Sequence, residues 1–270
     1  MVKISRAIFF LAIPFMIAAP SGCNGNVDEQ NSPSELVIYC ENGILKPIRE
    51  ITNYYETATG LNVRIRNDCA RNLVSFLHYR DEADIFIPDA AETLTSILQV
   101  DSLFFNDLVF LGHQSLVFFV QNGNPEQFDG HLKNLFEPKN GMVLANPESS
   151  TLGLLAGMML KENLMYEDAM NSVLFLTTDS RNLAQTVVKK QASLAIGWKS
   201  DYSEALSHQI DTVHIKGASP GTIHHKASAA LLQSAPHEDE ARRYLKLLTS
   251  AFATRIFEKY EIMKDSISGI

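Results

Sequence analysis

Residues 35–60 read ELVIYCENGILKPIREITNYYETATG, and this stretch decides the fold. Its first six residues form a compact apolar run, which predicts a buried strand, and the polar turn Glu41-Asn42-Gly43 follows. Apolar residues then recur with helical spacing, at Ile44, Ile48, Ile51 and Tyr55. Pro47 falls in the first turn of this helix, where proline is tolerated, and Gly60 is a typical helix end. The stretch therefore predicts a strand, a short turn and a helix.

The same alternation continues along the chain. Further strands are predicted at residues 61–65, 84–88, 142–145, 193–197, 213–215 and 227–232. Further helices are predicted at residues 73–77, 152–161, 182–189, 238–250 and 252–260. Two apolar runs, 108–111 and 115–121, are separated by Gly112-His113-Gln114, and we expect the second run to be a strand that crosses into another lobe. Strands alternating with helices predict an α/β fold in which a mostly parallel sheet has helices on both faces.

The N-terminus has the features of a targeting signal. Lys3 and Arg6 precede an apolar run at residues 7–19 that is too short to span a bilayer as a finished helix. Pro20-Ser21-Gly22-Cys23 then resembles the bacterial lipoprotein box, with proline where that box usually has leucine. We predict that residues 1–22 are a signal peptide, that Cys23 is lipidated and that residues 23–36 are a flexible tether; plain secretion is the alternative. The protein would then be periplasmic or extracytoplasmic and anchored to the membrane through Cys23.

The composition excludes some classes of function. The chain is 46% hydrophobic and 20% charged, as an ordinary globular protein is, and its formal net charge is −8. Nucleic acid is excluded as a partner, because a phosphate backbone needs a basic surface. The chain has no Gly-x-Ser-x-Gly elbow, no Gly-rich phosphate loop with Lys-Ser/Thr and no His-Glu-x-x-His, so we predict that it is not an enzyme. An acidic protein that binds an anion must do so with local backbone dipoles.

Such dipoles are expected at four junctions where a strand ends, a short polar turn follows and a helix begins. They are residues 41–43, 67–70, 146–152 and 177–181. Helix N-termini present unpaired N–H groups, and ligands of open α/β sheets bind beyond the carboxyl ends of the strands. Each turn alone is an ordinary helix cap, but turns that converge would form an anion site without any fixed positive charge.

With these features the chain resembles the molybdate-binding proteins of ABC importers, which have the type II periplasmic binding fold. The resemblance covers about residues 36–262 and is clearest at 39–60, 83–87 (ADIFI), 146–148 (NPE), 195–201 (AIGWKSD) and 255–260 (RIFEKY). It implies two lobes, each a mostly parallel sheet flanked by helices, with residues 37–114 and 226–270 in lobe 1 and residues 115–225 in lobe 2. It also implies a monomer without a cofactor that captures an oxyanion, molybdate or tungstate, by hinge closure and delivers it to an importer permease.

The resemblance also implies site residues. In that family two serine hydroxyls, a tyrosine hydroxyl and backbone N–H groups hold the oxyanion. By position the serines fall on Gly43 and on or next to Ala70, and the tyrosine falls on Trp198, so both serine hydroxyls are missing here. The predicted ligand-binding residues are Asn42, Gly43, Cys69, Ala70, Ser150, Thr151, Leu152, Ser180 and Trp198. Arg71 or Arg181 could add charge.

The missing hydroxyls leave the ligand open. Each donor that is not replaced costs roughly 1–3 kcal/mol of binding. The same fold could therefore serve another anion, a metal ion or a partner protein, and these alternatives stand beside molybdate and tungstate.

The remaining cysteines and a histidine pair were considered as further sites. Under the resemblance Cys40 and Cys69 fall on the first two ligand loops, and we predict a disulfide between them; two small buried side chains are the alternative. A soft-metal site needs more ligands than two sulfurs, and only His78 lies near them in sequence. His224 and His225 are adjacent on a predicted strand and point to opposite faces, so we expect no metal site.

Overall fold

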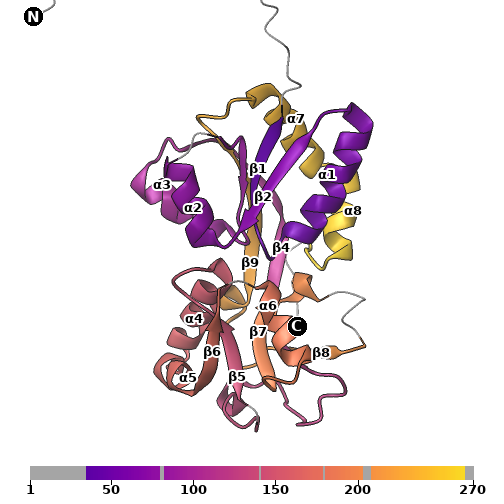
Figure 1. Ribbon diagram of the computed structural model, residues 1–270. Helices are drawn as coiled ribbons and strands as arrows, with labels where there is room; N and C mark the ends of the chain where they lie inside the picture. Colours follow the sequence, from indigo (N-terminus) through magenta and orange to yellow (C-terminus); the bar gives the residue numbers. More distant parts are fainter. Residues whose placement is uncertain (1–34, 80–81, 140, 179, 203–207, 265–270) are drawn as a thin grey trace, which may run out of the picture. The chain divides into compact units, whose positions relative to one another are not determined.

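A computed structural model describes residues 35–79, 82–139, 141–178, 180–202 and 208–264 (Figure 1). The predicted signal peptide, Cys23 and residues 24–34 of the predicted tether lie outside these residues. The tether prediction is too long by its last residue, because Leu36 already begins the first strand. Among the described residues, no helix combines the length and the apolar character needed to cross a membrane.

The first part of the chain alternates strands and helices as predicted. Its elements are β1 (Leu36–Glu41), α1 (Leu45–Thr59), β2 (Val63–Asp68), α2 (Ala70–Tyr79), β3 (Ile85–Ile87) and α3 (Ala91–Val100). Strand β1 lies between β2 and β3 and is parallel to both. Helix α1 ends at Gly60, whose φ of 73° places it in the left-handed conformation that glycine adopts at little cost.

Two long strands, β4 (Phe105–Gln121) and β9 (His224–Leu232), run side by side in opposite directions (Figure 1). Gly112-His113-Gln114, which separates the two apolar runs in the sequence, keeps pairing with β9, so β4 is one continuous strand through both runs. The polar segment produces only a register shift between Phe110 and Gly112. Beyond it, β4 pairs with β7 and β8 instead.

The second part of the chain contributes another set of alternating elements. They are β5 (Met142–Ala145), α4 (Thr151–Glu162), α5 (Tyr166–Ser172), β6 (Val173–Thr177), α6 (Arg181–Val188), β7 (Leu194–Trp198) and β8 (Ile210–His214). After β9 the chain ends in α7 (Glu238–Leu248) and α8 (Ala251–Lys259). Three short 3-10 helices, η1 (Leu132–Asn134), η2 (Lys199–Asp201) and η3 (Pro220–Thr222), lie in the connections.

The strands follow the order β2-β1-β3-β9-β4-β7-β5-β6, and β8 pairs with β4. The pairs β1–β2, β1–β3, β5–β6 and β5–β7 are parallel. The pairs that involve β4 or β9 are antiparallel. The predicted α/β class is thus confirmed, with a mixed sheet whose parallel parts are joined through β4 and β9.

The core follows from the alternation of side chains along β1. Leu36, Ile38 and Cys40 face one side and pack with residues of α1, α7 and α8, whereas Val37 and Tyr39 face the other side and pack with α2 and α3. A separate cluster gathers residues of β4, β5, β7, α4 and α6. The predicted lobe boundaries fall where β4 pairs with β9, at Gln114↔His225 and Ser115↔His224. The division into two lobes stays a prediction.

Candidate functional site

Glu41, the last residue of β1, lies at the meeting point of several helix starts. Its side chain is buried, with 1% exposure. Oε1 accepts a hydrogen bond from the N–H of Thr151 at the start of α4 (3.0 Å), and Oε2 accepts one from the hydroxyl of the same residue (2.7 Å). The backbone N–H groups of Asp89 (2.9 Å to Oε2) and Ala70 also donate to this carboxylate. Burial raises the pKa of Glu41, and these hydrogen bonds offset only part of the rise.

A second carboxylate, that of Asp89 after β3, lies next to Glu41 and is equally buried. Its Oδ1 accepts a hydrogen bond from the N–H of Gly43 (2.7 Å), and its Oδ2 accepts one from the indole N–H of Trp198 (3.1 Å). Burial, followed by the charges of Glu41 and Asp201, raises the pKa of Asp89 well above its ordinary value, against the two donors. The two carboxyl groups therefore share one buried environment, and the charge of Glu41 contributes to the raised pKa of Asp89.

Polar side chains hold the backbone around this pair in place. Gln114 donates through Nε2 to the carbonyl oxygen of Asp89. The hydroxyl of Ser200 lies 2.6 Å from Oε1 of Gln114 and 3.1 Å from the carbonyl oxygen of Gly43. Lys46 of α1 donates to the carbonyl oxygen of Asp201 over 2.6 Å. These bonds connect the end of β1 and the start of α1 with β4 and η2.

Of the nine predicted ligand-binding residues, four donate to the two carboxylates: Gly43, Ala70, Thr151 and Trp198. The other residues lie around them. Asn42 is buried and accepts a hydrogen bond from Asn67, and Ser150 is the N-cap of α4, where its side chain accepts from the N–H of Gly153. The side chain of Leu152 is fully buried in the core.

Ser180 and Cys69 donate no hydrogen bond to either carboxylate in the described part of the structure. The hydroxyl of Ser180 is buried and has no hydrogen-bond partner among the described residues. Cys69 donates its N–H to Asp68. The side chain of Arg181, one of the two arginines considered as added charge, lies outside the described part of the structure.

The predicted disulfide is not present, because Cys40 and Cys69 are both free, buried thiols. Cys40 is also not on a loop. It lies within β1 and faces the α1 side of the sheet, and in the strand pairing it is opposite Asn67. Cys69 directly follows β2 and directly precedes α2. Burial raises the pKa of both thiols, most strongly for Cys40, and keeps them as unreactive thiols.

The two acidic residues at the centre of the site were not among the predicted ligand residues. The sequence places Glu41 in a polar turn and assigns no role to Asp89. A signal does exist in the sequence: each acidic residue directly follows a short apolar strand and precedes a helix. That position is common for helix caps, and only the three-dimensional arrangement shows both side chains turning inward instead.

Metal ligation has no support in the described residues, since no group of three or more His, Cys, Asp or Glu side chains is arranged to hold an ion. His224 and His225 take separate partners. Nδ1 of His224 lies 2.8 Å from the hydroxyl of Ser115, and Nδ1 of His225 lies 2.8 Å from Oε1 of Glu92.

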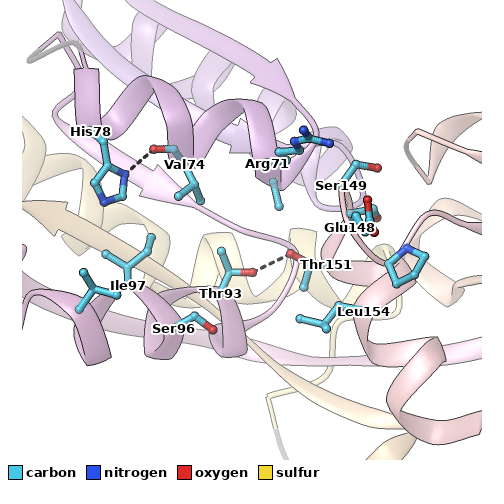
Figure 2. A pocket seen from close by; sticks show the side chains of 14 residues that line it. Arg71, Val74, His78, Thr93, Ser96, Ile97, Glu148, Ser149, Thr151 and Leu154 are labelled. Carbon is cyan, nitrogen blue, oxygen red and sulfur yellow. Dashed lines mark hydrogen bonds between the residues drawn. The ribbon is translucent and has the colours of Figure 1, made fainter. Parts of the chain in front are cut away.

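A cavity of about 350 Å³ opens directly beside Glu41, lined by α2, α3 and the turn before α4 (Figure 2). Ala70 and Thr151, which both donate to Glu41, form part of its wall. The hydroxyls of Thr93 and Thr151 lie 2.6 Å apart there. Apolar side chains supply much of the remaining lining, namely Val74, Ile97, Val100, Pro147 and Leu154.

One end of this cavity is polar. Figure 2 shows Arg71, Ser149 and Glu148 close together there, with His78 at the opposite end. The N–H of Arg71 donates to the carbonyl oxygen of Ser149 over 3.1 Å, which fixes the start of α2 against the turn before α4. The cavity thus offers a guanidinium group, hydroxyl groups and an apolar wall.

Comparison with known proteins agrees with this architecture. Residues 36–260 match the model of the bacterial extracellular solute-binding protein family. The chain belongs to this family. It is therefore an extracytoplasmic solute-binding protein. No curated protein matches the sequence of this family member.

Solved structures show that this solute-binding protein has the periplasmic-binding-protein fold. The periplasmic molybdate-binding protein of Azotobacter vinelandii superposes with a TM-score of 0.72 at 10% identity, covering 86% of this chain and 100% of that one. The substrate-binding domain of a molybdenum ABC transporter from Clostridium difficile gives 0.62 at 18% identity, covering 86% and 99%. PEB3 from Campylobacter jejuni with bound L-phospholactate gives 0.66 at 19% identity, covering 85% and 100%. At these identities the likeness shows the fold alone.

Proposed function

We propose that this solute-binding protein captures a small organic anion in the cavity between α2, α3 and α4 and delivers it to the permease of an ABC importer. The observation that carries the proposal is the cavity itself. Its volume of about 350 Å³ lies in the range of small-molecule sites, and it combines the cation of Arg71 with an apolar wall. A carboxylate or phosphate would lie at the end with Arg71 and Ser149, and the organic body would contact Val74, Ile97 and Leu154.

Free molybdate or tungstate, which the sequence favours, remains the second candidate. Two of the similar structures support it, one titled as a molybdate-binding protein and one as part of a molybdenum transporter. The structure with bound L-phospholactate supports the organic anion instead. We favour the organic anion because Gly43, Thr151 and Trp198, which would hold an inorganic oxyanion, already donate to Glu41 and Asp89.

The same geometry suggests how binding is signalled. The cavity is lined on one side by α2 and α3 and on the other by the turn that begins α4. A solute that contacts both sides favours the arrangement in which they are close, and the permease would recognise that arrangement. We further propose that the protein acts as a monomer and is held at the membrane by lipidated Cys23.

A thermal-shift panel on the purified protein tests the ligand class. One arm contains small phosphorylated and dicarboxylic acids, including L-phospholactate, and the other contains molybdate, tungstate, sulfate and inorganic phosphate. A ligand at 100 times its Kd stabilises the folded state by about 2.7 kcal/mol, which is a shift of several degrees in Tm. Stabilisation by an organic acid only is expected. A response to molybdate or tungstate only would contradict the organic-anion proposal and restore the second candidate.

A further inference from the structure

Backbone and side-chain donors from four separate elements converge on two carboxylates of the chain itself. Gly43 follows β1, Ala70 begins α2, Thr151 begins α4 and Trp198 ends β7. All of these donors are neutral. Such convergence of helix N-termini and neutral N–H groups is a site for negative charge.

The side chains of Glu41 and Asp89 lie among these donors and are shielded from solvent. Each of Glu41 and Asp89 is 1% exposed, and they are linked to each other by the bond from the N–H of Asp89 to Oε2 of Glu41. No lysine or arginine side chain in the described part of the structure forms an ion pair with either group. A buried carboxylate without a cation is costly unless several donors surround it, and here the donors are those of the anion site.

We propose that the carboxyl groups of Glu41 and Asp89 occupy an anion-binding site of this protein, so that it excludes free inorganic oxyanions. An oxyanion entering among these donors would have to displace a buried carboxyl group, because the N–H groups that would hold it already donate to Glu41 and Asp89. Glu41 also bonds Thr151 directly and so joins the end of β1 to the start of α4. This inference rests on the proposed function in one point. The organic solute is placed in the cavity lined by α2, α3 and the start of α4, and not among the donors that Glu41 and Asp89 occupy.

The test is a gain of function. The double variant Glu41→Ala/Asp89→Ala removes both carboxylates and leaves the donors in place. We expect it to bind molybdate or sulfate saturably with one-to-one stoichiometry in titration calorimetry, whereas the wild-type protein should show no saturable binding. Adding Trp198→Phe to the double variant removes one donor and should weaken the acquired binding.

A matched control uses a different buried carboxylate. Asp84 is 0% exposed and accepts hydrogen bonds from the N–H groups of His237 and of Val37, which lies near the start of β1, whereas Glu41 ends that strand. Asp84→Ala should therefore acquire no anion binding. The proposal is wrong if Asp84→Ala acquires the same binding. It is also wrong if the folded double variant binds no oxyanion at concentrations up to about 10 mM, a range that covers weak sites.

Two further measurements cover the case in which the double variant does not fold by itself. Folding of that variant on addition of molybdate or sulfate, followed by circular dichroism, would support the proposal. Wild-type crystals soaked in tungstate provide the reverse test, because tungsten bonded to the N–H of Gly43 and the indole of Trp198 would overturn it. Neither measurement involves the organic solute, so a failure of the proposed function leaves both results interpretable.

Discussion

The indole ring of Trp198 lies directly against the backbone of Gly43. A Cβ atom at residue 43 would be 2.5 Å from Cδ1 of Trp198 and 2.7 Å from Oδ2 of Asp89. The indole is fully buried and has no free space into which it could withdraw. The absence of a side chain at Gly43 is therefore a condition for the hydrogen bond between Trp198 and Asp89.

Gly43→Ser should accordingly destabilise the protein, although it restores a hydroxyl at the position where the molybdate-binding family has one. Overpacking of this kind costs typically about 1–3 kcal/mol. Urea unfolding followed by circular dichroism measures the change. Gly221→Ala is a suitable control, because the nearest atom to a Cβ there is 4.0 Å away. Equal stability of Gly43→Ser and wild type would mean that the indole can move aside.

Trp198→Phe should destabilise the protein for a different reason. The substitution keeps a ring in the core but leaves Oδ2 of Asp89 without its 3.1 Å donor. A buried acceptor that loses its partner costs about 1–3 kcal/mol. Because Trp198 is the only tryptophan, circular dichroism and not fluorescence must follow the unfolding. An unchanged free energy of unfolding would show that the hydrogen bond contributes nothing net.

The pH dependence of stability should depend on Asp89. Its pKa is raised well above the ordinary value by burial and then by the charges of Glu41 and Asp201, so the folded protein binds this proton more tightly than the unfolded chain does. The resulting stabilisation is complete below the unfolded pKa of about 3.9 and is lost as the pH rises through the folded pKa. As the pH rises from about 3.9 toward the folded pKa, the free energy of unfolding should fall more steeply in wild type than in Asp89→Ala. Parallel pH profiles for the two proteins would argue against a raised pKa.

Arg71 and Glu148 should have opposite effects on solute affinity. Both side chains are largely exposed at the polar end of the cavity (Figure 2). Arg71→Gln should weaken binding of an organic anion by about tenfold or more, since charge-assisted hydrogen bonds contribute about 1.5–3 kcal/mol. Glu148→Gln removes a nearby negative charge and should strengthen binding by a smaller factor. Titration calorimetry with the best organic acid of the panel measures both, and weakening by Glu148→Gln would place the anion elsewhere.

The fold was largely predictable because its signals are local. The strand, turn and helix of residues 35–60 follow from hydrophobic spacing and from the glycine that ends α1. The continuity of β4 was not predictable, since Gly112-His113-Gln114 interrupts the apolar pattern and keeps its strand conformation through pairing with β9. Tertiary hydrogen bonds overrode the local preference in that segment.

The candidate site was predictable only in part. Resemblance and turn chemistry indicated Gly43, Thr151 and Trp198, whose positions after strands follow from the chain order. What these donors bind was not predictable, because Glu41 and Thr151 are 110 residues apart and nothing local indicates that the carboxylate turns toward α4. The same limit applies to Cys40, whose side-chain direction depends on which face of β1 packs against α1.

The hydrogen bonds between Glu41 and Thr151 also affect how the protein responds to inorganic anions in the medium. A carboxylate attached to the chain has an effective concentration that the fold determines, and it cannot be diluted away. Dissolved sulfate or phosphate competes with it only when its own concentration approaches that effective concentration. A protein built in this way would not report ambient inorganic anions to the permease, and its response would be reserved for the organic solute.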